Sequence, residues 1–345
     1  MTTPDLRTEL VLEERPTGRA TRLSAATRRL QYFREGGLVV AILLTGTIFA
    51  LINSTFVDVQ NLTNIASQIS FIGVLAVSMT FVIITGEIDL SVGSMVAVAA
   101  VVFGTLLTDG VPLWAAIVLT LLAGCGMGAV NGALSIVLRV PTIIITLGML
   151  SAYRGLADEV ANGYPLGNYS KTGWFWAIGD QRLFGHIPYD ALVLLVFALG
   201  SGYVLRRTRT GLHVYAMGSD RRAAERAGLH VNRIRLGVLV FNGLAAGIAA
   251  LLAVTQAQTA DPNLGTGYEL EAIAAVIIGG AKLAGGSGTV LASVFGLLLI
   301  GMIQNGLVIV GVSIYLLVVV SGLVVIAAVA IDRFFVRRRE ATMSG

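Results

Sequence analysis

The chain has 345 residues, of which 55 % are hydrophobic and only 13 % are charged, and its formal net charge is +4. Soluble domains carry about 25 % charged residues, so this composition excludes an ordinary soluble enzyme and predicts a protein whose apolar surface faces lipid. The single cysteine excludes an intramolecular disulfide.

The first 36 residues are polar and rich in arginine, and they contain no apolar run that ends in a small-residue cleavage site. They are predicted to form a retained cytoplasmic tail and not a signal peptide. A basic arm that binds nucleic acid is the alternative. Membrane topology explains the arginines without a second partner, so no nucleic-acid partner is expected. Residues 333–345 are predicted to form a second cytoplasmic tail.

A membrane-spanning helix needs about 20 mostly apolar residues. Ten such segments are predicted, and counts from eight to eleven are defensible. The tract 62–107 is almost unbroken, and the segment 269–284 is short enough to be a half-helix. The segments are 37–56, 62–85, 90–107, 112–138, 141–159, 187–205, 234–258, 269–284, 289–310 and 313–331. The fold class is therefore an all-α integral membrane protein with broken helices, and its transmembrane domain covers 37–332.

The basic residues support this topology. With ten spans both termini lie on one side, and nearly all of the 24 lysines and arginines fall on that side. The exceptions are Arg154, Lys171 and Arg182. This bias follows the positive-inside rule, so both termini and the inner loop 206–233 are expected in the cytoplasm. The outer loop 160–187 is rich in aromatic residues, which favours an interfacial belt, with a docking surface for an external partner as the alternative.

A polar break from Gly86 to Ser94 interrupts the first apolar tract and carries two carboxylates. A charge at the bilayer centre costs about 2.5–3.5 kcal/mol on insertion scales, unless a broken helix there lines a cavity or a protein interface. Two interpretations stay open: a turn capped by Asp89 and Ser91, or part of the solute path or its gate. The path or gate candidates are Glu87, Asp89, Ser91, Asn131 and Asn305.

The inner loop contains a second feature. Ser219 or Asp220 is a suitable N-cap, Arg221 to Ala227 are mostly good helix formers, and Gly228 is a natural stop. The prediction is a helix of about two turns at the inner face, and the small residues at 223 and 224 would let it seat closely in a groove. An amphipathic surface helix held by anionic lipid is the alternative.

A second glycine-rich break runs from residue 279 to 288. The segments Val82–Gly86 and Val276–Gly280 look alike at an offset of 194 residues. Paired, glycine-interrupted segments in two halves are typical of a repeat built around a central pathway. One short match leaves chance similarity as the alternative, because apolar helices resemble one another.

The chain has no glycine-rich phosphate loop with its lysine, so any ATPase must be another chain. The three histidines lie apart at loop positions without metal-ligand spacing, and no catalytic set is suggested. We therefore expect no bound metal, no cofactor in this chain and no catalytic residue.

Three stretches carry a resemblance to a known family: 82–94, 210–228 and 267–288. They are similar to motifs of the ribose-type sugar permeases of bacterial ABC importers, and the resemblance extends from about residue 37 to 332. Position 87 is Glu where that family usually has Gly. Asp220 stands where Asn is common, and Ala227 where Ser is common.

The resemblance implies a permease in the bacterial cytoplasmic membrane that translocates a monosaccharide, of the pentose or hexose class. Two permease copies would form the channel in the lipid bilayer. A cytoplasmic ATPase with two nucleotide-binding domains would bind ATP and magnesium and dock on the inner loop, and an extracytoplasmic solute-binding protein would deliver the sugar. The coupling residues would be Ser219, Asp220, Arg221, Ala223, Ala224, Glu225 and Gly228. Alternatives are a permease for branched-chain amino acids or a signalling furanose, or an ion-coupled secondary carrier.

Overall fold

The computed structural model describes residues 36–171, 173–313, 315–317, 319–320, 322–323, 326 and 330. The predicted tails therefore lie outside the described residues, apart from Gly36, as does much of the predicted segment 313–331. The described part begins with the helix Gly36–Ile52 and a 3-10 turn at Ser54–Val57. The further elements are α2 (Val59–Ile84), α3 (Val92–Thr108), α4 (Leu113–Val137), α5 (Thr142–Ala161), α6 (Ala177–Asp180), β1 (Arg182–Leu183), β2 (Ile187–Pro188), α7 (Tyr189–Arg207), α8 (Arg209–Ser219), α9 (Arg221–Arg226), α10 (Val231–Ala257), α11 (Tyr268–Ile278) and α12 (Val290–Ile309).

The structure is a helical bundle, as the composition predicts. Among the described residues, five helices are long and apolar enough to cross a bilayer: α2, α4, α7, α10 and α12. Helix α11 has eleven residues, or about 16 Å at 1.5 Å per residue, which is half the thickness of the hydrocarbon core. The segment predicted at 269–284 is therefore a half-helix followed by an irregular turn.

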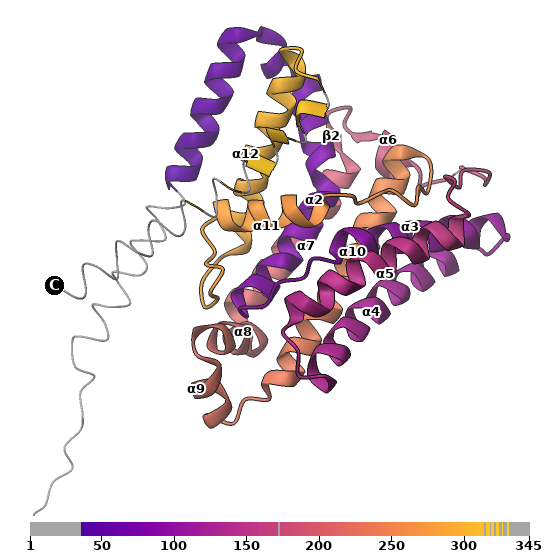
Figure 1. The fold of residues 1–345 in the computed structure, drawn as a ribbon. Coiled ribbons are helices and arrows are strands. Elements are labelled where there is room, and N and C mark those ends of the chain that lie inside the picture. The colour runs from indigo at the N-terminus through magenta and orange to yellow at the C-terminus, as the bar shows by residue number, and fades with distance from the viewer. Residues whose placement is uncertain are drawn as a thin grey trace, which may run out of the picture.

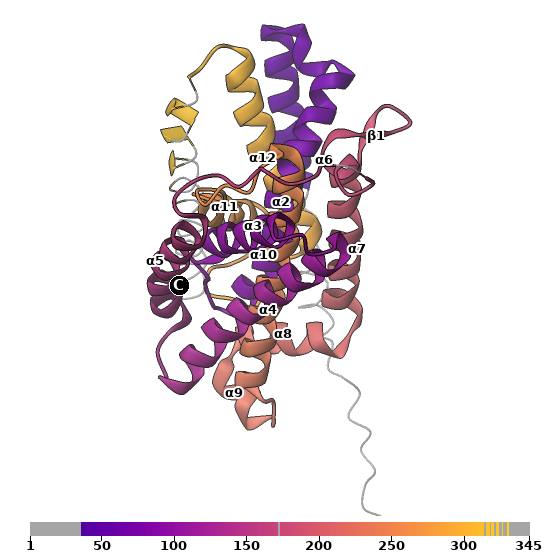
Figure 2. The same ribbon diagram turned by 90° about the vertical axis from the view of Figure 1, so that its right-hand side faces the viewer.

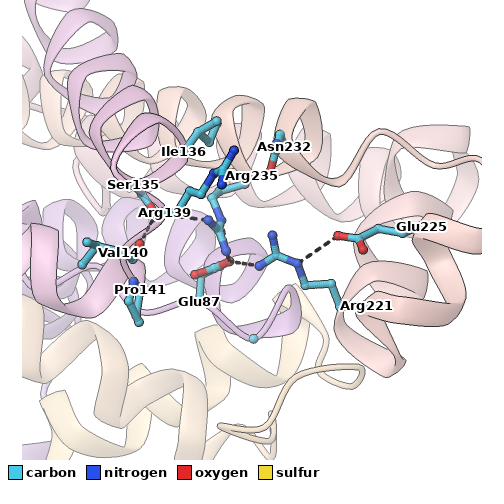
Figure 3. A pocket seen from close by; sticks show the side chains of 11 residues that line it. Glu87, Ser135, Ile136, Arg139, Val140, Pro141, Arg221, Glu225, Asn232 and Arg235 are labelled. Carbon is cyan, nitrogen blue, oxygen red and sulfur yellow. Dashed lines mark hydrogen bonds and ion pairs between the residues drawn. The ribbon is translucent and has the colours of Figure 1, made fainter.

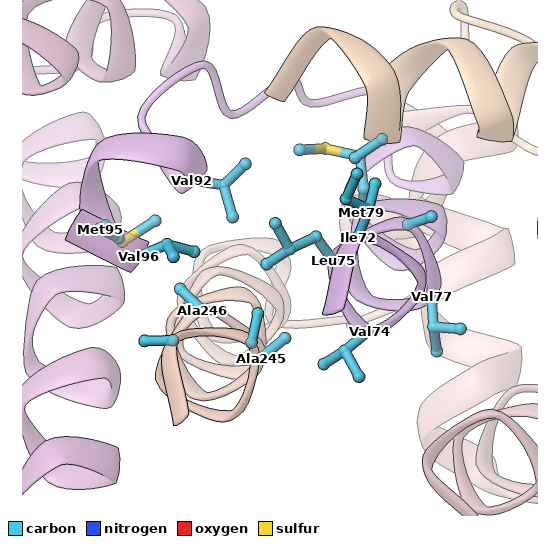
Figure 4. Packing of buried hydrophobic residues seen from close by; sticks show 14 of the residues in the cluster. Ile72, Val74, Leu75, Val77, Met79, Val92, Met95, Val96, Ala245 and Ala246 are labelled. Atoms are coloured by element: carbon cyan, nitrogen blue, oxygen red, sulfur yellow. The ribbon is translucent and has the colours of Figure 1, made fainter. Parts of the chain in front are cut away.

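Helices α2 and α10 occupy the centre of the bundle and are its most buried long helices. Helix α10 packs against α4, α2 and α3, and α2 also contacts α12, α7 and α11 (Figure 1). Small residues on α10, among them Ala245 and Ala246, face the larger apolar side chains of α2 and α3 (Figure 4). Small side chains allow helix axes to approach closely, which is how helices gain packing energy in lipid.

Two groups of short elements mark the ends of the bundle. Helices α8 and α9 lie together at one end, and α6 with the hairpin β1–β2 lies toward the other (Figures 1 and 2). The inner loop predicted at 206–233 thus contains two helices where the sequence predicted one. Helix α8 escaped prediction because His, Val, Tyr and Thr are weak helix formers and Gly is unfavourable, so its stability comes from tertiary packing.

The two broken helices end in the same local structure. The N–H of Gly86 donates to Ile83 O (2.9 Å) and that of Glu87 to Val82 O (3.1 Å). The equivalent bonds from residues 280 and 281 to residues 277 and 276 measure 2.8 and 3.1 Å, at the offset of 194 residues seen in the sequence. Both breaks are Schellman motifs, in which glycine takes the left-handed conformation: φ is +78° at Gly86 and +89° at Gly280.

Candidate functional site

The two breaks lie against each other, and α8 is seated on both. The N–H of Gly286 in the second break donates to the carbonyl of Ile84 at the end of α2 (2.8 Å). Gly218, in the last turn of α8, fits between them so closely that an added Cβ would lie 1.7 Å from Ile84 O and 2.7 Å from Gly286 N. Any displacement of α8 therefore acts directly on both breaks.

A tyrosine fixes α8 in this position. The hydroxyl of Tyr215 donates to the carbonyl of Gly288 (2.7 Å). Burial raises the pKa of this hydroxyl, with Arg206 acting in the opposite direction, so the group keeps its proton and remains a donor.

Helix α9 follows α8 directly and has the predicted caps. The carboxylate of Asp220 accepts from the N–H of Ala223 (3.0 Å), so Asp220 is the N-cap, while Ser219 ends α8. Gly228 has a φ of +82° beyond the C-terminus. The two alanines differ in burial: Ala223 is exposed, whereas Ala224 is buried against Met217 of α8 and Val231 of α10. Ala224 therefore holds α9 to its own chain, and Ala223 belongs to the outer face.

Glu87 joins α9 to the first break through an ion-pair cluster. Its carboxylate lies 2.5 Å from the guanidinium of buried Arg235 on α10 and 3.8 Å from that of Arg221 on α9 (Figure 3). Arg221 also pairs with Glu225 (3.3 Å), and Arg235 donates to the hydroxyl of Ser135 on α4 (3.1 Å). The cluster thus connects α4, α9, α10 and the break.

This cluster lines an open cleft of about 530 Å³ at the α9 end of the molecule. The α4–α5 turn closes one side of the cleft and places Arg139 beside Arg235 (Figure 3). Glu87, predicted as a path or gate residue, faces this cleft and its arginines. Of the five candidates it is the one in contact with the predicted coupling helix.

Three other path candidates meet in the interior. Buried Asp89 accepts from the N–H and hydroxyl of Ser91 (2.9 and 2.7 Å), and Asn131 of α4 donates to the same hydroxyl (2.8 Å). The second carboxylate oxygen of Asp89 accepts from Asn242 of α10 (3.0 Å), whose own oxygen accepts from Ser78 (2.7 Å). Asp89 therefore forms the centre of a hydrogen-bond network and does not itself cap α3, whose N-cap is Ser91.

Asp89→Asn is expected to keep the fold and most uptake. The amide oxygen still accepts from Ser91, and the Asn242 amide can turn over so that it accepts from the new NH₂ and donates to Ser78. Asp89→Ala leaves three buried donors without an acceptor and should lower stability by about 3 kcal/mol or more. Thermal unfolding and solute uptake measure the two effects. Loss of uptake in a well-folded Asp89→Asn variant would show that the negative charge itself is required.

Asn305 lies elsewhere. Its amide exchanges two hydrogen bonds with Asn61 (2.9 and 3.1 Å), which join α12 to the start of α2.

The sequence did not single out Arg235 as the buried partner of Glu87. The rule that an intramembrane carboxylate needs a cationic partner calls for such a residue, but the choice among many arginines depends on helix packing.

At the opposite end, around α6, two adjoining hollows of about 250 and 440 Å³ are lined by polar side chains. Amides predominate: Asn64, Gln68, Gln181, Gln256 and Gln258. Beneath them the buried carboxylate of Asp190 accepts from Ser67 and Gln256. Trp176 is buried at the edge of the larger hollow and stacks on Tyr169 at 5.6 Å, so it belongs to the protein interior, while Trp174 is exposed as expected for an interfacial residue.

These features define a class: a multi-pass helical membrane protein in which a peripheral helix pair rests on two broken membrane helices. The chain belongs to the family described as the permease component of the branched-chain amino acid transport system, which it matches over residues 61–329. It is accordingly the permease subunit of an ABC importer, a multi-pass protein of the bacterial cytoplasmic membrane and a transport subunit rather than an enzyme.

Relatives with more specific names share most of its length. The chain is 36 % identical over 312 residues to the ribose import permease protein RbsC of Escherichia coli, covering 88 % of this chain and 96 % of that protein. It is 32 % identical to the L-arabinose ABC transporter permease protein AraH of Azospirillum brasilense, over 90 % of this chain and 91 % of that protein. It is 33 % identical to the autoinducer 2 import system permease protein LsrD of Yersinia pseudotuberculosis, over 81 % of this chain and 85 % of that protein. The predicted resemblance to ribose-type sugar permeases is confirmed, and no solved structure matches the chain.

Proposed function

We propose that this permease translocates a monosaccharide and that α8 and α9 transmit the force of a separate ATPase to the two breaks. One observation carries the proposal: Gly218 of α8 is wedged between the ends of both broken helices. A short rigid helix pair in contact with both breaks can change their relative position when an external protein moves it. An ATPase that binds two states of the permease unequally would shift the population between them.

The proposed topology has ten spans with both termini in the cytoplasm. The α9 end then faces the cytoplasm, and the end with α6 and the hollows faces outward. The position of the arginine-rich segment 206–233 at one end of the bundle supports this orientation through the positive-inside rule.

The proposed partners follow from the class. A cytoplasmic ATPase with two nucleotide-binding domains holds ATP and magnesium and docks on the exposed face of α9, which includes Ala223 and Glu225. This chain then holds no cofactor of its own. A solute-binding protein docks at the α6 end, and a second permease copy completes the pathway. The alternative is an ion-coupled secondary carrier. Such a carrier works without an ATPase, so the exposed face of α9 would then have no binding partner.

The substrate class rests on the relatives' names and on the outer hollows. Amides both donate and accept hydrogen bonds, as the hydroxyl groups of a sugar do. The family description favours a second candidate, a branched-chain amino acid. An aliphatic side chain needs an apolar lining, whereas the hollows at the α6 end are lined mainly by amides and charged groups. The monosaccharide is therefore the stronger proposal.

Affinity purification of the chain from its native host in mild detergent tests the proposal. We expect a two-domain ATPase to co-elute, with vanadate-sensitive activity, and to be lost when residues 219–228 are replaced by a Gly/Ser linker. A chain that elutes alone, transports solute in liposomes without ATP and tolerates the replacement would be a secondary carrier.

A pair of neighbouring substitutions separates docking from folding. Ala223→Glu adds a charge to the exposed face of α9 and is expected to abolish substrate-stimulated ATPase activity while the permease keeps its melting temperature. Ala224→Glu places an unpaired carboxylate against Met217 and Val231 and should destabilise the permease itself. Thermal unfolding and ATPase assays are the measurements. Unchanged stimulation in Ala223→Glu would show that this face makes no contact with the ATPase.

A further inference from the structure

A groove separate from the site above opens between α7 and α10. It has a volume of about 660 Å³, and one residue of α2 and three residues of α8 complete its lining. Phe81 of α2, Phe197 of α7 and Phe241 of α10 form an aromatic wall, with ring centroids 5.0 and 5.5 Å apart. The rest of the lining along the two long helices is mostly aliphatic or glycine.

The groove changes character along its length. Its α8 end is polar and basic, with Thr210, His213 and Arg233 in the lining. Phe241 lies eight residues after Arg233 on α10, which places it about 12 Å deeper in the bundle. On α7 the lining likewise runs from Val204 to Val196, again about 12 Å. The groove therefore has a cationic mouth at its α8 end, and an apolar stretch about 12 Å long follows it.

Charge complementarity indicates what fills the groove. None of its described lining residues is acidic, and Arg233 is exposed and takes part in none of the ion pairs of the described residues. Further exposed arginines follow at the end of α7 and the start of α8. In the orientation proposed above, this mouth lies at the cytoplasmic surface, where anionic head groups attract basic side chains.

We propose that the groove binds one anionic phospholipid of the inner leaflet. Its phosphate lies at Arg233 and His213, and an acyl chain extends along α7 and α10 toward Phe241. The head group then bridges α8 and the start of α10, the two elements that flank α9. The lipid is a structural ligand of the helices that surround α9, and it is distinct from the transported solute.

Two glycines make the groove testable. A Cβ added at Gly237 of α10 or at Gly200 of α7 would meet no atom within 4 Å. A larger side chain at either position therefore begins with a Cβ that clashes with no protein atom, and phenylalanine is chosen to occupy the groove. Gly126 of α4 is equally open and lies outside the lining, so Gly126→Phe is the matched control.

The experiment is native mass spectrometry of the full-length permease in mild detergent, with phosphatidylglycerol and phosphatidylcholine supplied in equal amounts. We expect one bound lipid per chain with at least about a fivefold preference for phosphatidylglycerol. Gly237→Phe and Gly200→Phe should lose the lipid, and Gly126→Phe should keep it. Arg233→Gln should bind both lipids equally, and Arg233→Lys should restore the preference.

Equal binding of the two lipids by the wild-type chain would overturn the proposal. Retention of the lipid in whichever of Gly237→Phe and Gly200→Phe is well folded would do the same. If these variants instead separate a permease dimer into single chains, a second copy fills the groove and the lipid does not. Because the measurement uses no ATPase and no sugar, its outcome does not depend on the transport function.

Discussion

Gly218→Ala should have the largest effect of any glycine-to-alanine change among the glycines that the structure describes. The new Cβ would lie 1.7 Å from the carbonyl oxygen of Ile84 and 2.7 Å from the N–H nitrogen of Gly286, both backbone atoms that cannot turn aside. Overpacking costs about 1–3 kcal/mol and sometimes more, and we expect this case to reach about 3 kcal/mol or beyond. Helix α8 must then leave at least one break, so uptake should fall to background. Thermal unfolding and uptake in whole cells measure both effects.

Gly202→Ala of α7 is the matched control for this prediction. Its Cβ would meet only Val290 at 3.8 Å, an ordinary contact, so its melting temperature and uptake should equal those of the wild type. Normal uptake by the Gly218→Ala variant would mean that transport does not require the contact between α8 and the two breaks. The proposed route of coupling would then be wrong.

The second large effect concerns the ion pair between Glu87 and Arg235. Both side chains are buried, and Glu87→Gln leaves the guanidinium of Arg235 without its carboxylate. Removal of one partner of a buried pair costs about 3–5 kcal/mol, and Arg235→Gln should cost a similar amount. Both variants should melt earlier than the wild type and should weaken the response of transport to the ATPase, because the pair holds the first break to α10 beside α9.

A double-mutant cycle distinguishes this pair from two independent contacts. Glu87→Met combined with Arg235→Met removes both charges, and we expect the double variant to be more stable than either single variant. Arg221→Gln provides the comparison, since the Arg221 side chain is 43 % exposed and lies 3.8 Å from Glu87. Such a pair contributes about 0–1 kcal/mol. Strictly additive losses in the Glu87 and Arg235 variants would contradict the coupled pair.

The position of Glu87 also changes its interpretation. The sequence placed Glu87 with Asp89 and Ser91 as a group that could border the solute path. In the structure Asp89 and Ser91 point into the network with Asn131 and Asn242, whereas Glu87 reaches the cleft beside α9. An added charge at this position is therefore expected to influence coupling more than substrate choice.

The sequence by itself determined the features that depend on local chemistry. Composition and apolar runs determined the membrane class and the segments that became α2, α3, α4, α5, α7, α10 and α12. Capping residues determined α9, because the Asp220 carboxylate and Gly228 act within a few residues of the chain. The matching glycine breaks were visible as well, since a Schellman motif needs only a glycine after an apolar helix.

Only the tertiary structure decided which of these features meet. Helix α8 has weak intrinsic helix formers, and its stability depends on the seat of Gly218 and Tyr215 on the two breaks. Arg235, the partner of Glu87, lies 148 residues away in the sequence. The packing of α10 beside the first break brings the two side chains together. The burial of Ala224 and the exposure of Ala223 likewise depend on which residues pack against α9. Such contacts arise from helix packing, which residue patterns along a single chain do not specify.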